Sequence, residues 1–172
     1  SGIKSITLRH KVHLDLAAPE KASDRPQTQA LQEGETATVT SVGKFQYVLE
    51  QNLMTLEKDV RVVRPTAGGQ RDTLTCEQLT ILLSSTRAEN TTNMAGWLPR
   101  RLEVERLIAR GADTAEDPQR KVVVLTSPAN RCQGKRRECI YEPLTRTVIL
   151  RDPDGAFLQQ AMHELRCPEI TL

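Results

Sequence analysis

The residues that could carry chemistry are few, and their spacing matches no catalytic site. The chain has no H-E-x-x-H motif, no glycine-rich phosphate loop between a strand and a helix, and no serine at a nucleophile elbow. His10 and His13 are three residues apart on an expected strand, which places them on opposite faces and favours solvated side chains. Asp152 and Asp154 are typical of an exposed turn rather than of an acid–base pair. We therefore predict no enzyme, no catalytic residue, no metal and no cofactor.

The four cysteines, Cys76, Cys132, Cys139 and Cys167, leave three interpretations open. They are compatible with two disulfides in an oxidising compartment. We favour burial of Cys76 and Cys167 as small apolar residues at equivalent core positions. Cys132 and Cys139 could bridge a hairpin if the chain turned near Gly134, but on one continuous strand they would face opposite sides. Zinc is disfavoured, because no C-x-x-C pair or neighbouring histidine is present.

One local cluster of basic residues stands out between positions 131 and 137. Guanidinium groups match phosphate oxygens in a bidentate manner, so this cluster could clamp an anionic head group. A solvated strand whose charges protect a sheet edge is the competing interpretation. The candidate head-group residues are Arg131, Lys135, Arg136 and Arg137.

Composition narrows the class of protein. The 172 residues fit a single domain, residues 1–172, with enough chain to bury a core. A net charge of +2 with interspersed signs, and only 3% aromatic residues, argue against a nucleic-acid partner. No apolar run is long enough to span a membrane. Because both ends are strand-like, we expect the sequence to be a piece of a longer chain.

Strand patterns dominate the sequence, with turns about every ten residues, which suits an antiparallel all-β fold. Residues 17–35 are polar and aperiodic, and are expected to form a loop. Residues 101–111 fit either a helix or a strand, and the surrounding rhythm favours a strand. Asp152-Pro153-Asp154-Gly155 predicts a hairpin turn between two strands. The expected strands are 6–9, 12–16, 36–42, 45–49, 53–63, 74–83, 121–126, 147–151 and 156–160.

The chain also repeats itself. The segment LTCEQLTI at 74–81 returns as LRCPEITL at 165–172, with Leu, Cys and Thr at the same offsets. Upstream, the segment at 47–56 has the same order of tyrosine, polar turn and apolar strand as the segment at 141–150. We expect two repeats, about 44–83 and 138–172, joined by a polar linker at 84–100. A unit that cannot bury its own apolar face must stack on a neighbour.

These patterns resemble the LptA/OstA-like (organic solvent tolerance-like) family. The resemblance lies in VGKFQY at 42–47, in NLMTLEKDVRV at 52–62 and in the segment at 74–81, and it continues from about residue 36 to the C-terminus. The cysteines, the insertion at 84–100 and Pro168 depart from the family pattern. The resemblance implies a folded-over antiparallel sheet, a β-jellyroll or "β-taco", that encloses an apolar groove.

The resemblance further implies a periplasmic or cell-envelope protein that binds lipopolysaccharide or another amphiphilic lipid, stacks end to end with copies or neighbouring OstA-like domains, and does not span the membrane. The alternative is a non-catalytic structural scaffold of a larger envelope protein, with a filled core. The candidate lipid-groove residues are one face of several strands: Val12, Leu14, Phe45, Tyr47, Val60, Val62, Leu79, Ile81, Val122, Val124, Ile140, Val148, Leu150 and Leu158.

Overall fold

The computed structural model describes residues 4–17, 36–66, 69–85, 102–112, 122–128, 131–145 and 147–172. These residues form antiparallel strands and one 3-10 turn, η1 (Leu49–Gln51), which confirms the predicted all-β antiparallel class. Residues 102–110 are a strand, as the surrounding rhythm favours. The strands are β1 (Ser5–Arg9), β2 (Val12–Ala17), β3 (Thr36–Ser41), β4 (Lys44–Val48), β5 (Leu53–Pro65), β6 (Arg71–Ser85), β7 (Leu102–Arg110), β8 (Val123–Ser127), β9 (Cys132–Arg136), β10 (Glu138–Glu142), β11 (Thr147–Gln160) and β12 (His163–Thr171).

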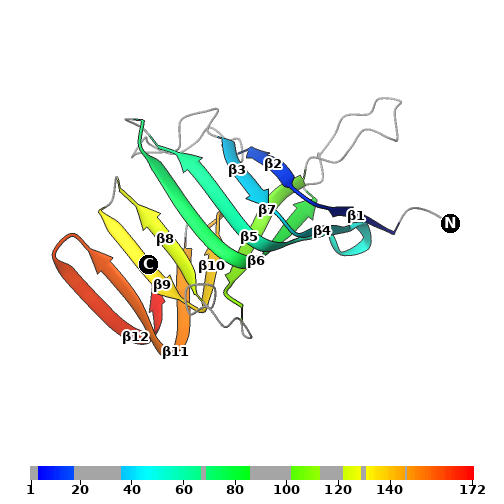
Figure 1. Ribbon diagram of the computed structural model, residues 1–172. Helices are drawn as coiled ribbons and strands as arrows, with labels where there is room; N and C mark the ends of the chain where they lie inside the picture. Colours follow the sequence, from blue (N-terminus) through cyan, green and yellow to red (C-terminus); the bar gives the residue numbers. More distant parts are fainter. Residues whose placement is uncertain are drawn as a thin grey trace.

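Two long bent hairpins, β5–β6 and β11–β12, organise the molecule (Figure 1). Each bends at a register shift, between Glu57 and Val60 in β5 and between Arg151 and Ala156 in β11. The short strands pair with one half of a long strand or the other. The result is two layers that share the long strands, as expected where bulges bend strands sharply.

We call these layers A and B. Layer A contains β1, β4, β7 and β10, with residues 53–57, 78–85, 147–151 and 169–171 of the long strands. Layer B contains β2, β3, β8 and β9, with residues 60–65, 71–76, 156–160 and 163–167.

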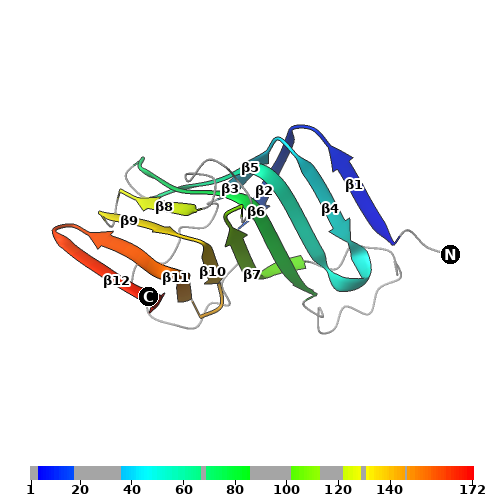
Figure 2. The same ribbon diagram turned by 60° about the horizontal axis from the view of Figure 1, so that its bottom comes forward.

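The strands of the two layers also close a ring. Hydrogen-bonded neighbours run β6–β7–β10–β11–β9–β8, and β8 pairs back onto β6. The fold therefore contains a closed six-stranded barrel, whereas a folded-over sheet would leave one side open. Strands β1 to β5 extend the sheet on one side of the barrel, and β12 borders the other. Figure 2 shows β1 and β12 at opposite ends of the molecule.

The predicted hairpin turn at 152–155 is wrong, because the chain bends there without reversing. β11 continues through these residues and pairs with β12 on both sides of the bend. Gly155 has a φ of 104°, a conformation that side chains disfavour, and Pro153 lacks a backbone donor. These residues produce a bulge that carries the strand from layer A to layer B.

The two long hairpins have corresponding registers. Cys76 pairs with Val60 just after the bend in β5, and Cys167 pairs with Ala156 just after the bend in β11. On the other side of each bend, Leu56 pairs with Leu79 and Leu150 pairs with Ile170. Of the expected linker at 84–100, residues 84 and 85 belong to β6 and the rest lies outside the described residues, as do residues 18–35 of the expected loop.

A glycine allows the chain to cross between the layers beside the bend of β5. The backbone N–H of Gly43 donates to the carbonyl oxygen of Glu57 at 3.1 Å, and that of Val42 donates to Lys58 at 3.1 Å. A Cβ at position 43 would overlap the Glu57 carbonyl and the Lys58 side chain. The tight crossing therefore requires glycine.

Alternation sets the inner and outer faces. On the outer face of layer A, Arg110, Glu138, Arg151 and Glu169 follow one another across β7, β10, β11 and β12. Arg110 Nε donates to Glu138 at 2.8 Å, and Arg151 Nε donates to Glu169 at 2.6 Å. The partners are at least partly exposed, so each pair adds little stability, but the charges fix which face meets water.

Candidate functional site

The space between the two layers is the candidate site, because the apolar side chains of both converge there. Residues from nearly every strand contribute. Among the described residues, 16 apolar ones are buried: Val12, Val39, Phe45, Leu56, Val60, Cys76, Leu79, Ile81, Leu83, Ala109, Val123, Cys139, Leu150, Ala156, Leu158 and Ile170. Each follows from period-two alternation, which points every second side chain of a half-buried strand inward.

Most of the predicted groove residues lie on this inner face. Seven are buried there: Val12, Phe45, Val60, Leu79, Ile81, Leu150 and Leu158. Four more are half-buried and pack against the buried set: Leu14, Tyr47, Val62 and Val148. Tyr47 also donates its hydroxyl to Asn52 Oδ1 at 3.4 Å, close to η1.

Three predicted groove residues are not on the inner face. In β8 the buried residues are Val123 and Ser127, which share one face, so Val124 points to the opposite face. In β10 the buried residue is Cys139, so Ile140 likewise points outward. Val122 precedes β8 and is half-buried outside the core cluster. The run of four apolar residues at 122–125 hides the alternation. This explains why the sequence pattern placed Val122 and Val124, rather than Val123, on the inner face.

The four basic head-group candidates do not form one cluster. Arg137 is committed to the bend of β11, with Nη2 2.5 Å from Asp154 Oδ2 and Nε 3.7 Å from Asp152 Oδ1. Lys135 is exposed on the outer face of β9, opposite Phe157 of β11. Arg131 is exposed beside the end of β9. Arg136 points inward, which separates it from the other three.

Arg136 is the most unusual residue of the interior. Its side chain is 0% exposed, and none of its three guanidinium nitrogens has a hydrogen-bond partner. Burial lowers the pKa of this guanidinium, because the apolar surroundings disfavour its charge. Alternation could have revealed it: Cys132, Gly134 and Arg136 share one face of β9, and two of the three are small residues suited to an interior.

A polar row crosses the inner face of layer B farther from the bends. Asp72 of β6 pairs with Arg64 of β5, and their side chains approach to 2.5 Å between Oδ2 and Nη2. The next strands continue the row with Ser127 of β8 and Cys132 of β9, which pair with each other. Asp72 Oδ1 is buried and has no hydrogen-bond partner. Sequence reasoning missed this row, since its members lie far apart in the chain.

All four cysteines carry free thiols. Burial raises the pKa of Cys76 from 9.0 to about 12, and burial also raises the pKa values of Cys139 and Cys132. A thiol with a raised pKa stays protonated near neutral pH and is a poor nucleophile or metal ligand. Cys76 and Cys139 act as small core residues, and the half-buried Cys167 donates its Sγ hydrogen to the Glu169 carbonyl at 2.8 Å.

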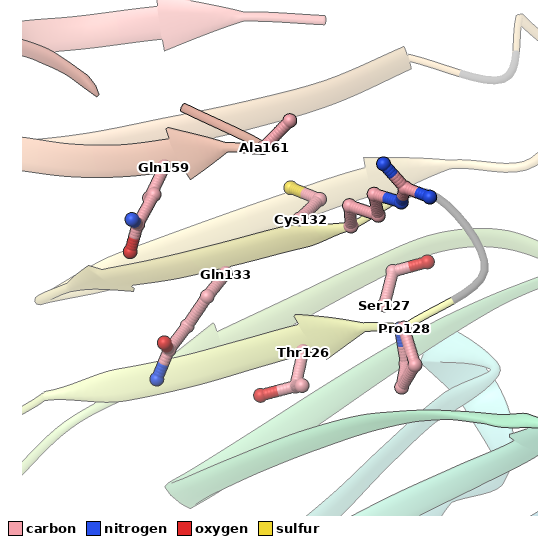
Figure 3. Close-up of a pocket in the computed structure, with 8 residues that line it drawn as sticks. Thr126, Ser127, Pro128, Cys132, Gln133, Gln159 and Ala161 are labelled. Carbon is pink, nitrogen blue, oxygen red and sulfur yellow. The ribbon is translucent and has the colours of Figure 1, made fainter. Parts of the chain in front are cut away.

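A pocket of about 270 Å³ opens where β8, β9 and β11 end (Figure 3). Its walls combine hydroxyl, amide and thiol groups with one exposed cation, a composition that can hydrogen-bond a polar group but contains no activated nucleophile. The lining residues are Thr126, Ser127, Pro128, Arg131, Cys132, Gln133, Gln159 and Ala161. Arg131 is the one head-group candidate among them.

Within the described ranges, no group of three or more His, Cys, Asp or Glu residues could hold a metal ion. No helix in the same ranges is long and apolar enough to cross a membrane. His10, with a φ of 71°, lies in the turn between β1 and β2 rather than on a strand with His13. Comparisons with family models, with curated proteins and with solved structures found no match to this chain.

Proposed function

We propose that this chain is a non-catalytic lipid-binding module of the cell envelope. In this proposal the two layers correspond to those of the LptA/OstA-like β-jellyroll ("β-taco"), with six of the strands closed into a barrel between the two ends. The acyl part of lipopolysaccharide, or of another amphiphile, lies between them. The supporting observation is that the apolar inner face continues to both ends of the molecule, where the terminal strands leave it open.

The terminal strands supply this support. At one end, Ile6 and Leu8 of β1 are 42% and 49% exposed, although they pair with the inner-face residues Tyr47 and Phe45. At the other end, Leu165 of β12 is 49% exposed and pairs with buried Leu158. Large apolar side chains exposed at the end of a core indicate a surface that a ligand or a partner covers.

The same ends favour end-to-end association. β1 pairs with β4 alone, β2 with β3 alone and β12 with β11 alone, so each has an edge that no described strand covers. An uncovered edge is a template for another strand. Stacked copies, or neighbouring domains of the same type, would extend the apolar interior from one module into the next across the periplasm.

The free-energy cost of exposing acyl chains to water supports this role. Each acyl CH₂ removed from water contributes about 0.8 kcal/mol, so a chain of roughly a dozen carbons costs on the order of 10 kcal/mol to hold in water. A lipid with several such chains needs apolar shielding to cross an aqueous compartment. Passive shielding requires no reactive group, which fits the protonated cysteines.

Site-specific photo-crosslinking tests the proposal. A benzophenone amino acid at Leu8 would lie on the inner face at the open end, whereas the same residue at Thr7, also exposed, would lie on the outer face. With a lipid A analogue present, we expect crosslinks from position 8 and not from position 7. Equal crosslinking from both positions, or none from either, would contradict lipid binding in the interior.

The second candidate function is a structural scaffold with a filled core. The complete burial of Leu56, Leu79 and Leu150 favours it, because side chains packed to that degree leave little room between the bends. A scaffold would bind no amphiphile at micromolar concentration. Displacement of a fluorescent fatty acid or lipid A analogue by titration therefore separates the two functions.

A further inference from the structure

Among the described residues, the interior contains one buried cation without a hydrogen-bond partner, which neither lipid binding nor a filled core requires. Arg136 is inaccessible to solvent, and its Nε, Nη1 and Nη2 atoms all lack hydrogen-bond partners. A guanidinium has five N–H donors that water satisfies in the unfolded chain. Burying all of them without an acceptor costs free energy on folding. A ligand that supplies an acceptor to this group would therefore recover that free energy.

The backbone makes room for this group. The guanidinium bends back along β9 and lies where a side chain at position 134 would begin. A Cβ on Gly134 would overlap Arg136 Nη2 and come within 2.8 Å of Cζ. Gly134 is also buried and pairs with Leu158 of β11 and Leu125 of β8. Glycine and arginine, two residues apart on one strand, thus form a cationic cradle, here defined as Gly134 and Arg136.

Among the described residues, those around the cradle are apolar or neutral, and none provides a counter-charge. Val123 of β8 pairs with Arg136 and is fully buried, and so is Ala156 of β11, which precedes Phe157, the partner of Lys135. The thiols of Cys132 and Cys139 are close enough to act electrostatically on Arg136. Burial keeps both thiols protonated at neutral pH, so neither supplies a negative charge.

The charge balance selects the ligand class. Among the described residues, Arg136 is the one buried cation, since Arg64 is half-buried and already paired with Asp72. One guanidinium balances one negative charge, and its planar fork matches a carboxylate. A phosphate monoester carries about −1.5 to −2 near neutral pH, which would leave uncompensated charge in an apolar site.

We propose that the cradle of Gly134 and Arg136 binds the carboxylate of a single-chain amphiphile, such as a fatty acid, whose alkyl chain lies along the apolar inner face. This inference rests on the proposed function, because it requires that the interior admit an amphiphile. It goes beyond that function by naming the residue that recognises the polar end and the chemistry that it recognises.

Fluorescence titration of the whole chain with parinaric acid and with the corresponding alcohol tests the inference. We expect the wild-type chain to bind the acid about 10- to 100-fold more tightly than the alcohol, as charge-assisted hydrogen bonds would give. Arg136→Met should bind the acid and the alcohol equally. Lys135→Met, which removes the neighbouring outward-facing cation, should keep the wild-type preference and serves as the matched control.

Folding of the variant is checked independently. Arg136→Met removes an unpaired buried charge and should raise the Tm of the ligand-free protein by at least about 3 °C. Arg136→Lys keeps the charge but loses the fork, so its preference for the acid should fall between those of wild type and Arg136→Met. Gly134→Val should reduce acid binding while leaving alcohol binding less affected, because it fills the place of the guanidinium.

Several outcomes would overturn the inference. Equal wild-type affinity for acid and alcohol, or an unchanged preference in Arg136→Met, would reject Arg136 as the recognition residue, while binding of the alcohol would leave the proposed lipid-binding function intact. Displacement of parinaric acid by dodecyl phosphate more readily than by dodecanoate would reject the carboxylate assignment. If the wild-type chain binds neither the acid nor the alcohol, the inference and the proposed function are rejected together.

Discussion

The two layers enclose one interior but present different chemistry to it. Across the centre of layer A, the inner face reads Leu8, Phe45, Leu56, Leu79, Ala109, Cys139, Leu150 and Ile170 from one end to the other. The inner face of layer B contains Ser41, Arg64, Asp72 and Arg136 among its apolar residues. A purely structural core needs only an apolar inner face like that of layer A. An apolar wall opposite a partly polar one suits a guest with an apolar and a polar part.

The largest effect should come from the centre of layer A. Leu79 is fully buried and pairs with Leu56 and Ala109, so Leu79→Ala should lower the free energy of unfolding by about 2–5 kcal/mol. Thr80→Ala, one residue along on the outer face, should change it by less than about 0.5 kcal/mol. Urea denaturation measures both. Similar losses in the two variants would mean that the inner face of layer A is not the main source of stability.

A smaller loss should follow from breaking the ion pair of layer B. Arg64→Met leaves the buried Asp72 carboxylate without its cation and should lower the free energy of unfolding by about 1–3 kcal/mol. Adding Asp72→Leu should recover most of this loss, because no charge then remains to be compensated. A double-mutant cycle measured by urea denaturation gives the coupling. Purely additive effects would show that the pair does not contribute as a unit.

The sequence predicted layer A better than layer B, for a physical reason. In β4 and in residues 78–81 of β6, both in layer A, apolar and polar residues alternate, so Phe45 and Tyr47, and likewise Leu79 and Ile81, could each be placed on one face. At 122–125, four consecutive apolar residues carry no period, so the pattern alone does not show that Val123 rather than Val124 is buried. Pattern reasoning succeeds where polar residues mark the outer face.

The features that depend on pairing between distant strands could not be read from the sequence. The row of Arg64, Asp72, Ser127 and Cys132 forms only when β5, β6, β8 and β9 are aligned. Similarly, a turn signal at 152–155 cannot reveal whether the chain reverses or bulges, because the partner strand β12 decides it. Simple alternation could have indicated the inward direction of Arg136, but its charged neighbours Lys135 and Arg137 made the segment resemble a solvated surface.

The loss of stability at alkaline pH should test whether Cys76 is buried on the inner face. The folded pKa is about 12 and the ordinary value is 9.0, so between these values the unfolded chain loses the thiol proton while the folded chain keeps it. The unfolded state then binds fewer protons, and stability, complete below pH 9, falls as pH rises toward 12. At pH 10 the loss from this thiol should be about 1.4 kcal/mol relative to pH 8.

Urea denaturation at pH 8 and pH 10 measures this loss. Cys76→Ala removes the titrating group, and its stability should decline less between the two pH values than that of the wild type. An identical decline in both proteins would show that Cys76 titrates normally and is not enclosed as described.

Substitutions of Gly134 and Arg136 in the cradle of layer B should be energetically coupled, with an effect similar to or smaller than that of Cys76. Gly134→Ala should lower the free energy of unfolding by about 1 kcal/mol, because the new Cβ displaces the buried guanidinium of Arg136. In an Arg136→Ala background the same change should be neutral or stabilising, since alanine loses less backbone entropy than glycine. Thermal denaturation of the four proteins gives the interaction energy. Equal effects of Gly134→Ala in both backgrounds would place the guanidinium elsewhere.

Substitutions at the open ends should have the smallest effect on the free energy of unfolding but a measurable effect on self-association. Leu165→Lys replaces a half-exposed leucine on the edge strand β12 and should change the free energy of unfolding by less than about 0.5 kcal/mol. If copies stack through this edge, the added charge should weaken self-association, because charged residues on edge strands oppose further pairing. Sedimentation velocity over a range of concentrations measures the association. Arg166→Lys, on the outer face of the same strand, is the charge-neutral control. A wild-type chain that stays monomeric at every concentration would remove stacking from the proposal, and the exposed leucines would then be explained by ligand binding alone.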